Sequence, residues 1–174
     1  MSIKTSALIL VISIFTLVAN GAEKIEGAFG LKLGATFIPT KPAVKIDQYE
    51  GYEFTPEMPN PAFSSYLVYV SPTSHLIYKI VAISAGVDKE TNQLLRTKIL
   101  AVVSRKYEDA PTVGEFLVQG SRALSITAYE QWRAADKWRL AISYDDRALE
   151  HRALEESHKI YREEMAKDVD ATGL

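Results

Sequence analysis

The fold of this chain is decided by residues 63–84, FSSYLVYVSPTSHLIYKIVAIS. Its two halves, residues 63–70 and 76–84, are dense in β-branched and aromatic residues, which favour strands. The turn residues Ser71-Pro-Thr-Ser74 lie between them, so the stretch predicts an antiparallel hairpin. Apolar side chains fall on both faces of these strands, which is typical of strands in the middle of a sheet.

The residues after this hairpin predict a helix over Asp88–Tyr107. Asp88 can cap the free amide groups of its first turn. Apolar residues recur along the segment at three- and four-residue spacing and form one apolar stripe. The stripe consists of Leu95, Ile99, Val102, Val103 and Tyr107.

Further strands are predicted on both sides of the hairpin and helix. The downstream strand patterns, which together give a β-meander, are Glu115–Gln119, Ser121–Tyr129 and Trp138–Tyr144. Upstream, residues 25–62 are rich in glycine and proline, which favour edge strands and ordered loops. Within that region Phe29–Leu33 and Ile46–Phe54 have the patterns of short strands.

The end of the chain predicts a second, charged helix. Asp145 or Asp146 is placed to cap it, and it runs to about Lys167. Its apolar residues form a broken stripe, so the helix either packs across the sheet edge or projects toward a partner. The stripe consists of Leu149, Ala153, Leu154, Ile160, Tyr161 and Met165.

These elements together predict an α+β protein with a single antiparallel sheet of hairpin, helix and β-meander. The sheet packs on the one amphipathic helix of residues 88–107, and the charged C-terminal helix is added to it. The expected organisation is one domain at residues 23–168, followed by a flexible tail at residues 169–174.

Residues 1–22 have the pattern of an export signal. Lys4 gives a positive start, Ala7–Val18 is an apolar run, and small residues follow at Ala19, Gly21 and Ala22. The apolar run is shorter than the roughly 20 residues that span a bilayer. We therefore predict cleavage near Gly21 or Ala22 and a periplasmic or secreted product without a stable membrane anchor.

Composition narrows the class of protein. The chain has no Cys, which excludes disulfides, thiol catalysis, thiolate metal sites and a lipid anchor on cysteine. Loss of Lys4 with the leader moves the net charge from −2 to −3, and this balance does not favour nucleic acid or an anionic membrane as a partner.

A family resemblance is carried by short motifs. Gly27-Ala-Phe-Gly-Leu-Lys-Leu-Gly34 resembles the FGxxLG opening of small exported bacterial proteins of unknown function. Asn60–Tyr66, Lys106-Tyr107 and the D-x-[ST]-G-L end at Asp170–Leu174 resemble further parts of that pattern. The resemblance implies export but no activity.

The arrangement is also similar to that of outer-membrane assembly lipoproteins and β-lactamase inhibitor domains, which pack helices on an antiparallel sheet. The chain differs from the lipoproteins in lacking the anchoring Cys. It differs from both in having a proline-rich arm where paired helices would stand.

Two patterns in the sequence have the spacing of ligand sites. His151, Glu155 and His158 share one face of the last helix, as weak candidates for metal ligands. Zinc sites usually draw ligands from more than one element, and the charged neighbours indicate a solvated helix, so no metal is predicted. Gly27, Gly30 and Gly34 are followed by prolines rather than a helix, which favours turns over a phosphate cradle.

No catalytic residues are predicted. Asp145, Asp146 and His75 are candidates for acid–base groups, but the aspartates lie where a helix cap belongs and His75 lies in a hairpin turn. The sequence has no Gly-x-Ser-x-Gly motif, no His-Glu-x-x-His motif and no Cys/His arrangement. We therefore expect a protein that is not an enzyme and that needs no cofactor.

The aromatic residues Tyr49, Tyr52, Phe54 and Trp132 are the candidates for an interaction surface. The alternative is that these rings cover the second face of the sheet. The sequence thus predicts an exported, soluble binding protein of the cell envelope, with an envelope or secreted protein as partner. An inhibitor or immunity-type protein against an envelope enzyme or toxin, and an envelope hydrolase, are the alternatives.

Overall fold

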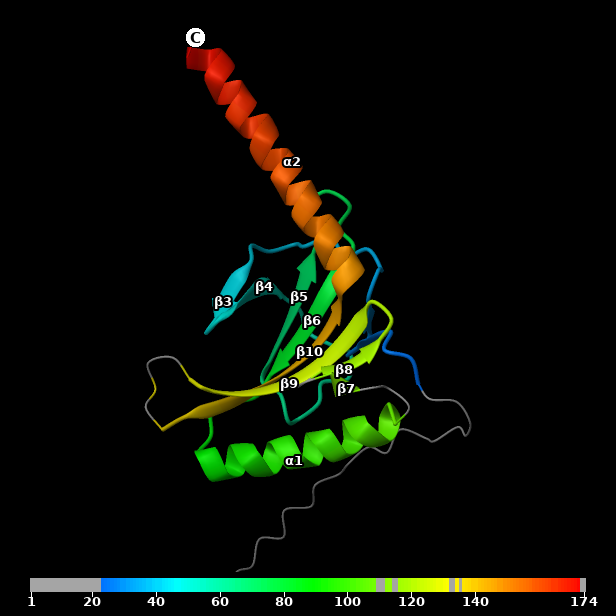
Figure 1. Cartoon of the computed structure of the whole chain (residues 1–174). Coiled ribbons are helices and arrows are strands. Elements are labelled where there is room, and N and C mark those ends of the chain that lie inside the picture. Colours follow the sequence, from blue (N-terminus) through cyan, green and yellow to red (C-terminus); the bar gives the residue numbers. More distant parts are fainter. Residues whose placement is uncertain (1–22, 109–111, 114–115, 132–133, 135, 173–174) are drawn as a thin grey trace, which may run out of the picture.

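The computed structural model describes residues 23–108, 112–113, 116–131, 134 and 136–172 (Figure 1). The predicted leader at residues 1–22 lies outside the described residues. The described part is an α+β protein with two helices and antiparallel sheets, as predicted.

The larger sheet is antiparallel throughout and has the strand order β3-β4-β5-β6-β10-β9-β8-β7. The predicted hairpin is β5 and β6, and β6 also pairs with β10, which places the hairpin inside the sheet. The strands are β3 (Val44–Ile46), β4 (Tyr49–Glu53), β5 (Ser65–Val70), β6 (Ile77–Ile83), β7 (Thr112–Val113), β8 (Phe116–Gln119), β9 (Arg122–Glu130) and β10 (Trp138–Asp146).

The prediction of a single sheet was wrong. Strands β1 (Gly27–Ala28) and β2 (Leu31–Lys32) form a separate two-stranded sheet. The predicted strand over residues 29–33 is broken because Phe29 and Gly30 both have positive φ, 56° and 85°, as in the primed turns that close two-residue hairpins. A Phe in this region is strained, but its ring packs edge-on against aromatic neighbours. These neighbours are Phe63, Tyr66 and Tyr144.

Helix α1 (Lys89–Lys106) covers one face of the sheet against β9 and β10, and Asp88 caps it as predicted. Leu95, Ile99, Val103 and Tyr107 pack into this core, whereas Val102 is 66% exposed. The predicted stripe was therefore wrong at Val102. The buried face of α1 includes position 92 instead. Asn92 is buried there, and its amide atoms have no hydrogen-bond partner among the described residues.

The other face of the sheet is covered by the β3–β4 hairpin. A turn at Asp47 splits the single strand that was predicted over residues 46–54. The hairpin curls back over the sheet, because the Asp47 carboxylate lies 3.5 Å from Arg139 Nε and accepts a hydrogen bond from the Tyr129 hydroxyl at 3.3 Å. The apolar residues enclosed beneath it are Leu67, Val81, Ile83 and Ala141.

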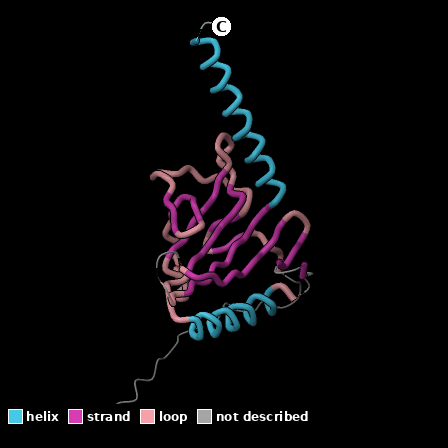
Figure 2. Tube along the Cα trace, turned by 60° about the vertical axis from the view of Figure 1, so that its left-hand side comes forward, coloured by secondary structure: helices cyan, strands magenta, loops and turns pink. Residues whose placement is uncertain are grey.

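Helix α2 (Arg147–Thr172) follows β10 directly and extends farther than the predicted end at Lys167. Its first turns contact β6, β9 and β10. The rest of the helix projects away from the domain, at the opposite end from α1, in both views (Figures 1 and 2). Of the two arrangements predicted for this helix, the base packs on the sheet and the remainder projects.

Candidate interaction surface

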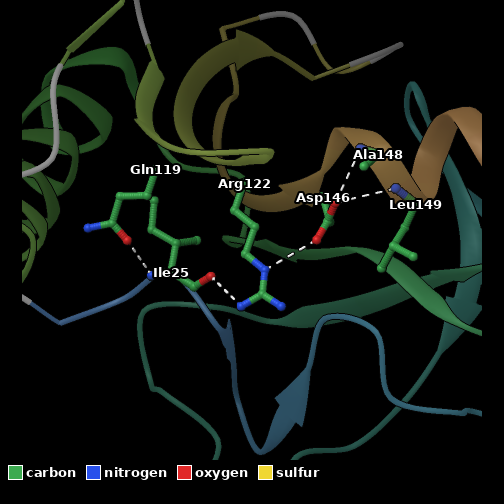
Figure 3. A network of polar contacts seen from close by, with 6 residues as sticks. All are labelled: Ile25, Gln119, Arg122, Asp146, Ala148 and Leu149. Carbon is green, nitrogen blue, oxygen red and sulfur yellow. Dashed lines mark hydrogen bonds and ion pairs between the residues drawn. The ribbon is translucent and has the colours of Figure 1, made fainter.

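The start of α2 is fixed by one carboxylate. Asp146 Oδ1 accepts hydrogen bonds from the backbone N–H groups of Ala148 (3.2 Å) and Leu149 (3.3 Å), and Oδ2 pairs with Arg122 Nε at 3.2 Å (Figure 3). Of the two predicted caps, Asp146 is therefore the one that begins the helix. Burial alone would raise the pKa of Asp146, but hydrogen bonds from Ser121, Arg122 and Leu149 outweigh it and lower that pKa.

The same arginine ties the first described residues to the domain. Arg122 Nη1 donates to the carbonyl of Ile25 at 3.1 Å, and the Ile25 N–H donates to Gln119 Oε1 at 2.7 Å (Figure 3). The Gln119 amide also donates to the Glu23 carbonyl at 3.1 Å, and Ile25 is fully buried. One cluster therefore joins residues 23–25, the β8–β9 hairpin and the α2 cap.

A second attachment holds α2 near its third turn. Glu156 accepts hydrogen bonds from the N–H groups of Thr73 (2.8 Å) and Ser74 (3.1 Å) and from the Ser74 hydroxyl (2.7 Å). The Ser74 hydroxyl and these N–H groups lower the pKa of Glu156. Ala153, one turn earlier, is buried against the domain. The base of α2 is therefore held at two points.

This attachment predicts a pH-dependent loss of stability in Glu156→Gln. Because the folded state lowers the pKa from its ordinary value of 4.5, the carboxylate contributes stability above that pH and loses it as the pH falls. Urea unfolding should show Glu156→Gln less stable than the wild type by about 1 kcal/mol at pH 7. The difference should shrink as the pH falls below 4.5 through the lowered pKa of the folded state, and Glu163→Gln is the exposed control. A difference that does not shrink in acid would contradict the attachment.

The face of α2 turned away from the domain carries exposed apolar side chains. Leu154 is 54% exposed, Tyr161 63% and Met165 47%, and His158 is exposed between them. Their spacing of i, i+4, i+7 and i+11 places the four on one side of the helix. Ala153 and Glu156, which hold the base, lie on other sides. We call Leu154, His158, Tyr161 and Met165 the outer face.

Charged residues border this outer face. Helical spacing places Glu155 and Arg162 along one edge, seven residues apart, with Glu150 and Glu164 along the other edge. Glu163 lies on the opposite side of the helix. The exposed apolar stripe is thus edged by charges of both signs.

The aromatic residues predicted for an interaction surface are not gathered into an exposed patch. Tyr49 packs on the second face of the sheet, with its ring 5.8 Å from that of Tyr129. Tyr52 and Phe54 are half-buried against the core on the first face. Trp132 lies outside the described residues. For the three described rings, packing on the sheet is the interpretation that the structure supports.

The three residues named as candidate metal ligands, His151, Glu155 and His158, are all exposed on α2. His151 Nδ1 lies 3.4 Å from Glu155 Oε1, and both side chains are largely exposed. Within the described ranges, no three His, Asp or Glu side chains lie close enough to hold a metal ion together. His158 lies on the outer face, so its place in the protein is better described as part of that surface.

The two aspartates named for acid–base chemistry have separate structural partners. Asp145 pairs with Lys79 at 3.1 Å and accepts from the Ser143 hydroxyl at 2.7 Å, while Asp146 caps α2. His75 lies in the β5–β6 turn at φ 54°. The glycines at 27, 30 and 34 all have positive φ, as expected for turns.

A shallow cleft between α1 and the ends of β9 and β10 was not predicted. It has a volume of about 360 Å³ and is lined by Asn92, Arg96, Thr127 and Trp138 among others. Lys89 Nζ lies 5.3 Å from the centre of the Trp138 ring. Trp138 is half-exposed at this cleft, although it alternates along β10 with the buried residues Leu140 and Ile142.

Comparisons with protein-family models, curated proteins and solved structures gave no match for this chain. The resemblance to small exported bacterial proteins therefore stays a prediction. Neither helix in the described part is long and apolar enough to cross a membrane.

Proposed function

We propose that this chain is an exported protein that works by binding a protein partner through the outer face of α2. The observation that carries the proposal is the exposure of Leu154, Tyr161 and Met165 on one side of a helix that leaves the domain. Anchors at i, i+7 and i+11 are the pattern by which an amphipathic helix packs its apolar side against a partner. The export-signal pattern that the sequence predicts at residues 1–22 supports the exported location.

The chemistry of the partner follows from the edges of this surface. The partner offers an apolar strip that contacts Leu154, Tyr161 and Met165. Beside that strip it has a cation opposite Glu155 and a carboxylate opposite Arg162. Asp146 and Glu156 already hold the base of α2. Binding to a helix that is held in place costs less conformational entropy than binding to a free segment.

The test is site-specific photo-crosslinking of the full chain in living bacterial cells. A photoreactive amino acid replaces Tyr161, and a matched variant carries it at Glu163, which is exposed on the opposite side of the same turns. We expect an adduct of one defined mass from position 161 and none from position 163. The adduct should be found in the periplasm or the medium, and the chain within it should have lost its leader.

Disruption of the outer face should remove that adduct. Leu154→Glu combined with Met165→Glu should abolish crosslinking while leaving the unfolding midpoint unchanged, because both side chains are exposed. Absence of an adduct at position 161, or equal adducts at 161 and 163, would contradict binding through this face. A chain that keeps its leader and stays in the cytoplasm would contradict export.

A further inference from the structure

We propose that the partner of the outer face is a second copy of this chain, and that two α2 helices pair side by side in antiparallel orientation. This inference rests on the proposed function and names its partner. It is argued from the order of apolar residues along the outer face and from the charges on its edges. The resulting dimer would have twofold symmetry, with the same surface used on both copies.

The outer face matches itself when one helix is reversed. Leu154 then lies opposite the partner's Met165, and His158 lies opposite the partner's Tyr161. Twofold symmetry repeats both contacts, so the pairing has four layers. The two outer layers are purely aliphatic, and each inner layer combines a histidine with a tyrosine. All four side chains are exposed in the single chain and therefore free to be covered.

The edge charges select the antiparallel orientation. In that orientation Glu155 lies against the partner's Arg162, and the symmetric contact repeats the attraction. On the other edge Ser157 faces the partner's Glu164, which brings no like charges together. A parallel pairing would instead place Glu150 against the partner's Glu155 twice, and this repulsion disfavours it. Antiparallel helix dipoles add a smaller preference in the same direction.

The shape of the molecule leaves room for this pairing. Residues 154–165 span about 17 Å of helix axis at 1.5 Å a residue. They start at the turn where Glu156 is bonded to the domain and continue toward the part of α2 that projects from it (Figures 1 and 2). The domain is attached at the start of α2, so reversal of one helix puts the two domains at opposite ends. Four layers form a small interface, and we expect a dissociation constant on the order of 0.1 mM.

The test is sedimentation equilibrium of the full mature chain at concentrations from about 0.01 to 1 mM, chosen to bracket that expected dissociation constant. The average mass should rise from that of the monomer toward that of the dimer. Glu155→Arg and Arg162→Glu should each weaken association by about tenfold or more, because each sets like charges against one another. The double variant Glu155→Arg/Arg162→Glu restores opposite charges and should return to within about threefold of the wild type. Glu163→Arg makes the same charge change off the face and should have no effect.

Three results would overturn the inference: a monomer at every concentration, a dimer that neither single reversal weakens, or a double variant no tighter than the singles. The crosslinking experiment separates this failure from failure of the proposed function. An adduct from position 161 with twice the mass of the chain supports self-pairing. An adduct of the chain with a different protein overturns self-pairing but keeps the binding function, and no adduct overturns both.

Discussion

Replacing Asp146 by alanine is expected to lower the free energy of unfolding by about 2–3 kcal/mol. The change removes the acceptor for the N–H groups of Ala148 and Leu149, and loss of such a cap costs about 1 kcal/mol. It also leaves the partly buried Arg122 without its carboxylate, which adds about 1–2 kcal/mol. Urea unfolding at pH 7, read by circular dichroism, measures the loss.

Asp146→Asn is the matched control, because an amide oxygen still caps α2 while the charge opposite Arg122 is gone. We expect about half of the alanine effect. The cost of Asp146→Ala should also depend on pH. Since folding lowers the pKa from its ordinary value of 3.8, the carboxylate's contribution is complete above about pH 5 and declines as the pH falls below 3.8. An alanine variant as stable as the wild type at pH 7 would contradict the role of this residue.

Gly27→Ala is expected to destabilise the protein by about 3 kcal/mol or more. A Cβ at this position would meet the Leu31 carbonyl oxygen and lie 2.8 Å from Lys32 Cα, both backbone atoms of the facing strand. The backbone φ of 146° at Gly27 is also one that residues other than glycine rarely adopt. The β1–β2 turn would have to shift, and with it the Phe29 ring that packs in the core.

Gly30→Ala separates the steric effect of the added Cβ from the strain of a positive φ. Gly30 also has a positive φ, of 85°, but a Cβ there would meet no atom within 4 Å. It should therefore cost only the backbone strain, about 1–2 kcal/mol. Thermal unfolding of the two variants side by side measures the difference. Equal losses would show that the contact with β2 is unimportant and that strain alone acts at both sites.

The parts of the fold that the sequence predicted are those with local causes. The β5–β6 hairpin follows from side-chain preference and turn residues, and Asp88 caps α1 because its side chain reaches an N–H three residues away. The parts it missed depend on contacts between distant residues. Phe29 holds a positive φ within a cluster of rings from two other segments, and Asp47 is drawn across the sheet to Arg139. Local patterns carry no record of such contacts.

The candidate surface was missed for a different reason. The apolar residues of α2 were interpreted as one broken stripe, whereas they form two separate faces. Leu149, Ala153 and Ile160 lie on the side of the domain, and Leu154, Tyr161 and Met165 lie on the outer face. Helical spacing alone could have separated the two sets. Which of them is covered by the domain could be learned only from the packing.

The contacts that hold residues 23–25 on the domain bear on when the predicted leader would be removed. The backbone N–H and carbonyl of Ile25 are both occupied, by Gln119 and Arg122, and its side chain is fully buried. With the predicted cut near residue 21 or 22, a peptidase that binds its substrate as an extended strand would need the backbone groups of the residues beside the cut. If Ile25 is among those residues, the peptidase and the folded domain would compete for the same backbone groups, and we expect the predicted leader to be removed before these contacts form.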